Sequence, residues 1–342
     1  MLANLAIGEQ AAGNAPLVIS LLSGGSTRER LIAAGVEVHQ LGMRPGWRAV
    51  TGLWQLVRLI RARRPDVIQS WMYHADLASL VALWLSGRRS RTRLFWGIRC
   101  SDMDWSRYRS LSRLVMRVSA CLSRFPDAVV VNSEAGRAWH ARLGYRPRRF
   151  VLVDNGLDPE RYVADPASRA AVRAELSLPP DAVVVGAVAR VDPMKDYPTL
   201  LAALGRLDGI VCVAVGSGTQ RLPPTPGLLR LGERRDVPRL LNAFDVFVSA
   251  SAFGEGFSNA IIEAMATGLP VIATDVGDAR RIVGDGGVIV PPGDAAALAE
   301  AIRGLACNPG RRRALGQRAR ARVEAQFTLA RAAASFETLY CE

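Results

Sequence analysis

Short apolar runs recur along the chain, and stretches with helical spacing of apolar residues separate most of them. Each run has the length and composition of a buried β-strand rather than of a helix. The runs occupy residues 17–22, 36–41, 67–71, 94–98, 128–132 and 150–153 in the first half, and 183–189, 210–215, 228–231, 246–249, 271–274 and 287–290 in the second. This alternation predicts an α/β fold, in which helices cover both faces of parallel sheets.

Turn-forming residues divide the pattern near its middle. The segment 155–159, Asn-Gly-Leu-Asp-Pro, carries two turn-forming pairs, and the polar stretch 165–178 precedes the next strand. Two domains also suit 342 residues, because single cores rarely grow that large. Helical spacing covers residues 311–340, and we expect its last part to pack back toward the N-terminal domain. The predicted units are residues 1–158, 159–325 and 326–342.

Residues 47–64 are predicted to form an amphipathic helix with many arginines. Its apolar face comprises Val50, Leu53, Trp54, Leu56, Val57 and Ile60. Such a helix usually packs on its own sheet, which is the interpretation that we favour. A basic helix with tryptophan also suits an anionic membrane surface, and that alternative stays open.

The composition narrows the class of protein. The net charge of +13 favours an anionic partner, which can be nucleic acid, a membrane surface or a substrate. The arginines are spread along the chain without a nucleic-acid-binding motif, so we predict no nucleic-acid partner. The 5 cysteines are scattered and never spaced Cys-x-x-Cys, which predicts free thiols in a reducing cytoplasm. We see no signal peptide and no run of about 20 apolar residues that would cross a bilayer.

Lys195 is the only lysine among 44 cationic residues. It follows Arg190 in the loop between the predicted strand 183–189 and a helix that begins near Tyr197. Two cations at the carboxyl end of a strand, before the N-terminus of a helix, suit a diphosphate. Arginine binds phosphate oxygens through its fork, whereas lysine acts as a compact charge. A chance pair on a solvated loop is the alternative.

The most specific stretch is residues 255–275, EGFSNAIIEAMATGLPVIATD. A glycine-rich loop there leads into a helix that begins near Ser258 and is predicted to end at Gly268-Leu269-Pro270, with glycine as its C-cap. Gly256 in the loop allows close approach of the backbone to a ligand. The amides of Phe257, Ser258 and Asn259 are predicted to face the cleft as free donors.

Two glutamates in this stretch, Glu255 and Glu263, stand eight residues apart. Eight residues of helix rise about 12 Å, whereas the carboxyl groups of glycosidases lie roughly 5–9.5 Å apart. A hydrolytic pair therefore fits poorly. Separate roles fit better, with Glu255 at a sugar and Glu263 at the hydroxyls of a ribose.

The segment 190–294 resembles the donor-binding domain of retaining glycosyltransferases of the family 4 type, which have the GT-B fold of two Rossmann-like domains facing across a cleft. The resemblance rests on the spaced glutamates with the run 263–274, on Arg190 and Lys195, and on Asp245-Val-Phe-Val-Ser249. It covers about a third of the chain closely and most of the remainder loosely.

This resemblance implies roles for the candidate residues. Arg190 and Lys195 would bind the diphosphate of a UDP- or GDP-linked sugar. Glu255 and the backbone of the following turn, Gly256, Phe257, Ser258 and Asn259, would hold the donor sugar and phosphate, and Glu263 would hold the ribose. Gly232, Glu233 and Arg234 would lie near the base. Transfer is expected to retain the anomeric configuration, without a metal or other cofactor.

Two residues of the N-terminal half are further candidates. His74 follows the strand 67–71, where the family often has a histidine facing the cleft near the donor sugar; a surface histidine at a helix start is the alternative. Arg99 ends the next strand at the same rim. It is predicted to contact donor or acceptor, with a structural ion pair as the equal alternative.

One departure from the family pattern stands at the N-terminus. The family opens with a strand and a Gly-Gly loop, whereas residues 1–6 already resemble the helix after that loop, and Gly24-Gly25 follows the next strand. We therefore expect an N-terminal domain without its first strand and Gly-Gly loop, either because the start is assigned too late or because the chain is truncated. Weak solubility or low activity is the expected consequence.

The sequence thus predicts a cytoplasmic glycosyltransferase that acts on a glycan or polyprenyl-linked acceptor in the synthesis of cell-surface polysaccharide or lipopolysaccharide. Arg190, Lys195, Glu255 and His74 are the predicted catalytic residues. A nucleotide-sugar-binding protein without turnover is the main alternative, because of the missing loop, and an epimerase is another. A nicotinamide oxidoreductase is disfavoured, since Gly-x-Gly-x-x-Gly is absent.

Overall fold

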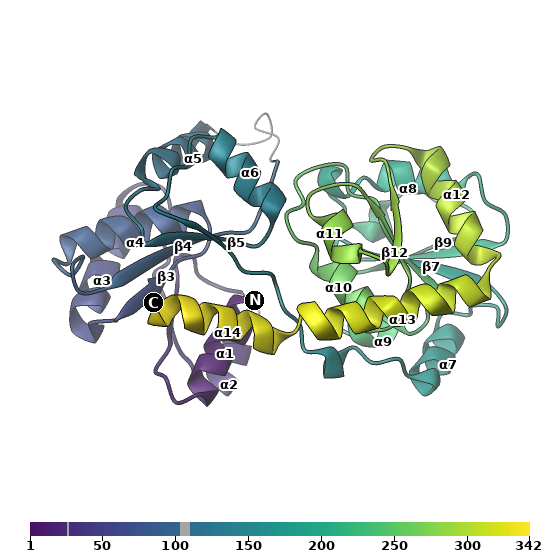
Figure 1. Ribbon diagram of the computed structural model, residues 1–342, viewed down its shortest axis with the longest axis horizontal. Coiled ribbons are helices and arrows are strands. Elements are labelled where there is room, and N and C mark those ends of the chain that lie inside the picture. Colours follow the sequence, from purple (N-terminus) through teal and green to yellow (C-terminus); the bar gives the residue numbers. More distant parts are fainter. Residues whose placement is uncertain (26, 103–109) are drawn as a thin grey trace.

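The computed structural model describes residues 1–25, 27–102 and 110–342, which form two α/β lobes side by side (Figure 1). In the N-terminal lobe, parallel strands β1 and β2 form one sheet and β3 to β6 form another. Their bounds are β1 (Leu17–Ser20), β2 (Glu37–Gln40), β3 (Val67–Gln69), β4 (Arg93–Ile98), β5 (Ala128–Val131) and β6 (Phe150–Leu152). Among the described strands, β1 pairs only with β2, and β3 only with β4, so this lobe has its sheet in two parts.

The C-terminal lobe contains one parallel sheet in the order β12-β11-β10-β7-β8-β9. These strands are β7 (Val183–Val188), β8 (Ile210–Val215), β9 (Leu228–Gly232), β10 (Val246–Ser249), β11 (Val271–Thr274) and β12 (Gly287–Val290). Neighbouring residues of one strand contribute to different cores, since Val184 belongs to one apolar cluster and Val185 to the other. A sheet buried on both faces explains why its strands are continuous apolar runs. The predicted strands and the α/β class are confirmed.

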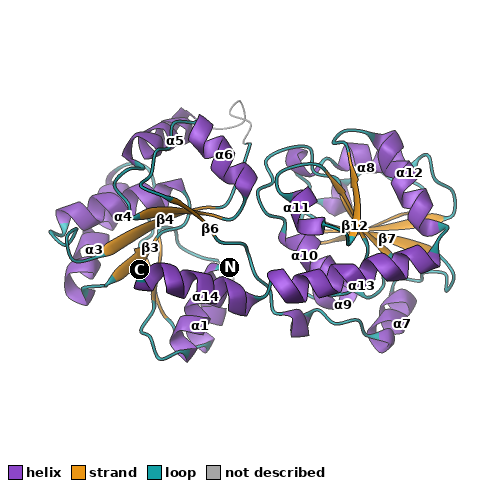
Figure 2. Ribbon diagram, viewed as in Figure 1, coloured by secondary structure: helices purple, strands orange, loops and turns teal. Residues whose placement is uncertain are grey.

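Helices cover the sheets of both lobes (Figure 2). Those of the N-terminal lobe are α1 (Leu2–Ala11), α2 (Thr27–Ala33), α3 (Trp47–Arg63), α4 (Tyr73–Leu85), α5 (Ser110–Leu122) and α6 (Glu134–Arg142). The second half of the chain adds α7 (Pro166–Glu175), α8 (Tyr197–Leu204), α9 (Val237–Leu241), α10 (Asn259–Ala266), α11 (Ala279–Val283), α12 (Ala295–Ala306), α13 (Pro309–Gln326) and α14 (Leu329–Cys341). Several begin at a residue whose side chain caps the helix, such as Ser133, Asp165 and Asp294.

The helical stretch predicted over residues 311–340 is two helices, not one. The chain bends at Phe327, which is buried with its ring 5.5 Å from that of Phe257, and Thr328 caps α14. Helix α13 packs on the C-terminal lobe, whereas α14 returns to the N-terminal lobe, where Phe336 joins the same cluster as Phe95 (Figure 1). The periodicity of apolar residues could not show this bend, because both helices have an apolar face.

The two lobes are joined by two adjacent crossings of the chain. Leu157 donates its N–H to the carbonyl of Phe327 at 3.0 Å, and Leu329 donates to the carbonyl of Leu157 at 2.8 Å. At Gly156 an added Cβ would lie 2.4 Å from the carbonyl oxygen of Thr328, so only glycine fits there. The crossings therefore form one narrow paired connection.

Helix α3 buries only part of its predicted apolar face. Val57 and Ile60 pack in the N-terminal core, which confirms the packing interpretation. Trp47, Val50 and Trp54 remain 70%, 57% and 50% exposed. The apolar face that the sequence predicts for α3 is therefore wider than the part that packs on the core.

Candidate functional site

Three loops of the C-terminal lobe meet at the carboxyl edge of its sheet. They follow the adjacent strands β7, β10 and β11, and they contain residues 189–196, 250–258 and 275–278. Because the carboxyl ends of parallel strands share one edge, residues far apart in sequence come together here.

Lys195 and Glu255 are in direct contact at this edge. The ammonium group of Lys195 contacts the carboxylate of Glu255, and the two side chains are only 16% and 14% exposed. Ser251 donates its hydroxyl to Glu255 Oε2 at 3.2 Å. A cavity of about 20 Å³ lies beside Lys195 and is also lined by Ser251 and Ser258. The loops thus join a cation with a carboxylate in a partly desolvated place, where charge interactions are stronger than in water.

The glycines of the second loop lie in close contact with neighbouring side chains. Gly254 has φ +75°, and a Cβ there would lie 2.7 Å from the Met194 sulfur. A Cβ on Gly256 would lie 3.0 Å from the hydroxyl oxygen of Ser133, which belongs to the opposite lobe. The hydroxyl of Ser101 also reaches across and donates to the carbonyl of Glu255. The loop is therefore pressed between the lobes.

The start of α10 is held by a chain of polar contacts from the N-terminal lobe. Arg99 Nη1 donates to Asn155 Oδ1 at 3.0 Å, and Asn155 Nδ2 donates to Asn259 Oδ1 at 2.9 Å. Ser258 occupies the N-cap position without a side-chain capping bond. The ring of Phe257 packs on Phe327 in the core, so this residue presents only its backbone to the cleft edge. Helix α10 ends as predicted, with Gly268 at φ +82° just beyond it.

Arg99 is half-buried, with guanidinium nitrogens Nε and Nη2 fully covered, and it has no carboxylate partner among the described residues. Its guanidinium lies 4.3 Å from the ring centre of Trp71 and 5.8 Å from that of Phe336. Burial lowers the pKa of Arg99 to about 9. The structural ion pair considered from sequence is therefore replaced by a hydrogen bond to Asn155 and by cation–π contacts.

Glu263 lies on α10 and is half-buried. Desolvation raises its pKa, while a hydrogen bond with Tyr162 and the nearby charge of Arg161 oppose that rise. The carboxylate is thus already engaged with the segment that follows the first crossing between the lobes.

The remaining candidates differ in their surroundings. Arg190 is exposed and its Nε lies 3.4 Å from Asp192 Oδ2. His74 is exposed on the first turn of α4. Glu233 is exposed, while Arg234 is held by Asp236 at 2.7 Å and by Glu175 at 3.0 Å. Gly232 has φ +73° and donates its N–H to the hydroxyl oxygen of Thr219 at 2.9 Å.

Sequence reasoning missed a buried polar cluster next to the candidate cleft. His140, not His74, is the buried histidine; its Nε2 lies 2.8 Å from the Tyr73 hydroxyl, which is 3.1 Å from the Cys100 sulfur. Burial lowers the pKa of His140 to about 4. Burial also raises the pKa of Asp76, one turn along α4 from Tyr73, to about 7. No motif marked these residues, because they come from three separate elements.

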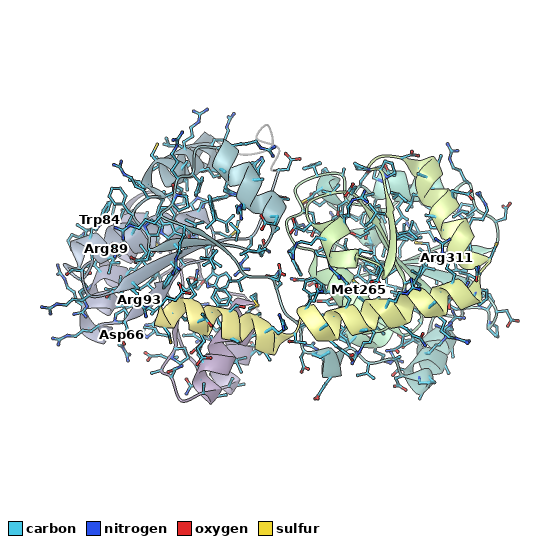
Figure 3. The ribbon with its side chains drawn as sticks, viewed as in Figure 1. Asp66, Trp84, Arg89, Arg93, Met265 and Arg311 are labelled. Carbon is cyan, nitrogen blue, oxygen red and sulfur yellow. The ribbon has the colours of Figure 1, made fainter. Side chains whose placement is uncertain are left out.

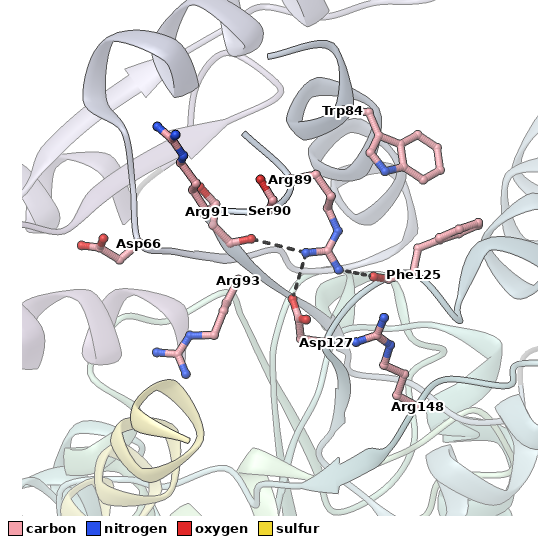
Figure 4. Close-up of a pocket in the computed structure, with 10 residues that line it drawn as sticks. Asp66, Trp84, Arg89, Ser90, Arg91, Arg93, Phe125, Asp127 and Arg148 are labelled. Carbon is pink, nitrogen blue, oxygen red and sulfur yellow. Dashed lines mark hydrogen bonds and ion pairs between the residues drawn. The ribbon is translucent and has the colours of Figure 1, made fainter. Parts of the chain in front are cut away.

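A cavity of about 680 Å³ lies at the other edge of the N-terminal sheet (Figure 4). Arg93 begins β4, and Asp127 directly precedes β5. The cavity is therefore at the amino ends of these strands. Arg89 occupies its centre, where it donates to Asp127 and to the carbonyl of Phe125. Figure 3 places Trp84 and Arg89 at the outer end of this lobe, away from the C-terminal lobe. The cavity is thus separate from the Lys195 site.

Comparison with known proteins places both halves of the chain in one group. The family described as Glycosyltransferase Family 4 matches residues 1–161, and the family described as Glycosyl transferases group 1 matches residues 180–308. The chain belongs to the family 4 glycosyltransferases. The expected resemblance to the family 4 type is thereby confirmed.

Curated relatives cover part of this family 4 chain. D-inositol 3-phosphate glycosyltransferase of Mycobacterium marinum is 33% identical over 201 residues, which are 53% of this chain and 42% of that protein. The protein of the same name from Mycobacterium tuberculosis is 32% identical over 223 residues, or 59% and 46% of the two chains. The chain spans less than half the length of these relatives.

Solved structures extend the likeness to the whole chain. HepE of Anabaena, solved with UDP-glucose, superposes with a TM-score of 0.86 at 23% identity and covers 100% of this chain and 95% of that one. The lipopolysaccharide outer core galactosyltransferase WaaB gives a TM-score of 0.73 at 15% identity over 98% of this chain and 93% of that one. At these identities the likeness establishes the fold, which is GT-B.

Proposed function

We propose that this family 4 protein transfers a sugar from a nucleoside-diphosphate sugar to a glycan or polyprenyl-linked acceptor in the synthesis of cell-surface polysaccharide or lipopolysaccharide. The observation that carries the proposal is the contact of Lys195 with Glu255, beside a glycine loop pressed against the opposite lobe. A cation, a carboxylate and the start of a helix meet there, which suits a ligand with both phosphate and hydroxyl groups.

In the proposed reaction, the bond between the anomeric carbon and the β-phosphate oxygen breaks, and the electron pair stays on the diphosphate. The oxygen of an acceptor hydroxyl forms the new bond to the anomeric carbon, and its proton passes to the departing phosphate. Lys195, Arg190 and the N–H groups at the start of α10 stabilise the charge that develops. In the structure Lys195 is paired with Glu255. A phosphate that binds Lys195 takes the place of the Glu255 carboxylate in that pair. The freed carboxylate then accepts hydrogen bonds from hydroxyls of the sugar.

We also propose retention of the anomeric configuration and independence from metal. The sequence contains one Asp-x-Asp pair, Asp102 and Asp104, and Asp104 lies outside the described residues. Addition of a chelator tests the metal requirement directly, and the expected result is an unchanged rate. The coupling constant of the anomeric proton in the product, measured by NMR, reports whether the donor configuration is kept.

Peripheral attachment to the inner face of the plasma membrane is a further part of the proposal. Trp47, Val50 and Trp54 project from α3 next to Arg48 and Arg58, a combination that suits an anionic lipid surface. No described helix is both long and apolar enough to cross a bilayer. The double variant Trp47→Ser, Trp54→Ser should pellet less with anionic vesicles, whereas Val163→Ser, exposed on the other lobe, should pellet like the wild type.

A screen of UDP- and GDP-linked sugars tests the central proposal. We expect product from at least one donor, and a loss of about 10²-fold or more in turnover for Lys195→Ala. Arg206→Ala, an exposed cation at the other edge of the same sheet, is the matched control and should be fully active. Donor binding without product in the wild type would favour the alternative, a binding protein. No binding of any donor would reject both.

A further inference from the structure

Asp278 stands where three parts of the molecule meet. It lies in the loop between β11 and α11 of the C-terminal lobe and is only 5% exposed. Its two carboxylate oxygens accept the N–H groups of Glu134 and Ala135, both at 2.9 Å. These two amides begin α6 of the N-terminal lobe. One carboxylate therefore connects the lobes directly.

This contact completes the cap of α6. The first N–H groups of a helix have no partner within the helix. Ser133 accepts the third of them, from Gly136, at 3.0 Å, and Asp278 accepts the first two from the other lobe. A negative charge at this end of a helix is also favourable, because the N-terminus carries a partial positive charge.

Asp278 caps α6 and leaves its own helix, α11, without a side-chain cap. It occupies the N-cap position of α11, where an aspartate side chain commonly accepts backbone N–H groups of the helix that follows. Its carboxylate makes no capping bond to α11. Arg281, one turn along α11, instead donates to Asp278 Oδ2 at 2.7 Å. The side chain is therefore directed to the opposite lobe.

The backbone around Asp278 is joined to the glycine loop. The N–H of Asp278 donates to the carbonyl of Gly256 at 3.1 Å. Gly277 has φ +60°, and a Cβ there would lie 1.9 Å from the carbonyl oxygen of Glu255. The two loops are packed without space for a side chain, so a displacement of Asp278 displaces the backbone of Glu255.

Arg281 extends the contact to the connection between the lobes. Its Nη1 and Nη2 donate to the two oxygens of Asp154, at 2.9 and 2.6 Å, just after β6. Such a bidentate pair fixes geometry as well as charge. The ion pairs raise the pKa of Arg281, so it stays charged at any working pH.

We propose that Asp278 is a positioning residue that holds the two lobes closed and fixes the loop of Glu255 in that closed arrangement; its expected effect on turnover rests on the proposed function. When the lobes separate, the amides of α6 and the carboxylate both gain water as a partner, while Arg281 stays beside Asp278. Because hydrogen bonds to water replace those between the lobes, the net free energy of the contact is small and the contact is reversible. Rigid-body motion about the paired crossings at Leu157 and Phe327 leaves both cores intact.

The separation of the lobes can be measured with native thiols. Cys121 on α5 and Cys307 after α12 are exposed, one on each lobe, while Cys100 and Cys212 are buried. With Cys341→Ser in the background, a fluorophore pair on Cys121 and Cys307 reports the distance between the lobes by energy transfer. We compare Asp278→Ala and Asp278→Asn with Asp275→Asn, a control in the same loop whose ion pair with Arg280 is exposed.

The expected result is lower energy transfer for Asp278→Ala, a partial effect for Asp278→Asn, which keeps one acceptor oxygen, and none for the control. With UDP-sugar, kcat should fall about tenfold for Asp278→Ala while the Kd for UDP changes less than about threefold, because closure rather than binding is lost. Unchanged energy transfer in Asp278→Ala overturns the proposal. So does a Kd for UDP that rises as much as kcat falls, since that indicates general damage to the loop.

These outcomes are separable from failure of the proposed function. If the wild type binds no nucleotide, the proposed function fails, while the energy-transfer arm still decides whether Asp278 holds the lobes together. If Asp278→Ala does not fold, as judged by its circular dichroism, Asp278→Asn carries the test.

Discussion

The two lobes share an α/β architecture. They differ in how many buried polar atoms lack a hydrogen-bond partner and in how many large apolar side chains are exposed. Buried polar atoms without a partner occur in the N-terminal lobe, for instance Trp96 Nε1, Asp76 Oδ2 and Arg99 Nη2, and none is found in residues 166–342, which are described in full. Large exposed apolar side chains follow the same division, since Val163 and Val191 are the only ones in residues 159–342, all of which the structure describes. Unpaired buried groups and exposed apolar surface both cost stability.

This difference suggests that the two lobes have different roles. A continuous six-stranded sheet, buried on both faces, gives the C-terminal lobe a rigid edge on which Lys195 and Glu255 are fixed. The N-terminal lobe has its sheet in two parts and buries titratable groups in its core. We therefore expect the C-terminal lobe to determine nucleotide binding, and the N-terminal lobe to determine stability limits and acceptor-side adaptability.

The largest expected effect concerns α14, which belongs to the second half of the chain but packs on the first lobe. Phe336 is fully buried against Phe95. Phe336→Ala should destabilise the N-terminal lobe by about 3–5 kcal/mol, the usual cost of a buried phenylalanine. Hydrogen exchange followed by mass spectrometry should show faster exchange in β4 and β5 and no change in β7 to β12. Equal acceleration in both lobes would contradict separate stabilities.

A second effect tests the division of tasks in binding. Lys195→Ala should weaken binding of UDP, the nucleotide of the HepE complexes, by about tenfold or more, because a desolvated cation is lost from the site. His74→Ala on the exposed start of α4 should leave UDP affinity within about twofold, whatever it does to turnover. Isothermal titration measures both. Loss of UDP affinity in His74→Ala would show that the N-terminal lobe also binds the nucleotide.

A third effect is the response of the N-terminal lobe to pH. Burial raises the pKa of Asp76 to about 7, so its contribution is present at low pH and is lost as pH rises toward 7. Burial lowers the pKa of His140 to about 4, so its contribution is present above the ordinary value of 6.5 and is lost as pH falls toward 4. The two terms oppose each other over the same range.

Replacing one of these two groups should make the pH dependence of stability that the other contributes measurable. In Asp76→Asn, the His140 term remains, and the N-terminal lobe should lose on the order of 2 kcal/mol of stability between pH 6.5 and pH 4. In His140→Gln, stability should rise over the same change of pH. Urea unfolding followed by tryptophan fluorescence, at a series of pH values, measures both. Parallel pH profiles for the two variants would be incompatible with the assigned pKa directions.

The smallest expected effect lies where the lobes touch. Gly256→Ala brings a Cβ within 3.0 Å of the Ser133 hydroxyl oxygen, so the loop must shift slightly away from the N-terminal lobe. We expect a loss of about three- to tenfold in kcat/KM with little change in melting temperature. Gly205→Ala, where the nearest atom would be 3.7 Å away, is the control. An unaffected Gly256→Ala enzyme would mean that this contact tolerates displacement.

Local patterns were sufficient for much of the fold. Apolar runs located the strands because each is buried on a sheet, and the Gly268-Leu269-Pro270 signal ended α10 where the structure ends it. The contact of Lys195 with Glu255 followed from a general rule, that loops after adjacent parallel strands meet at one edge. The exposed side of α3 did not follow, because apolar spacing does not state which neighbour will cover a face.

The sequence by itself determined the α/β class, the strands, the family and the loops that carry the candidate donor site, because these depend on local spacing and on motifs. Only the tertiary structure decided that Asp278 caps a helix of the other lobe, that Arg99 reaches Asn259 through Asn155, and that His140 rather than His74 is buried. Each of these contacts joins residues distant in the chain, and which distant groups meet is settled by how the lobes pack.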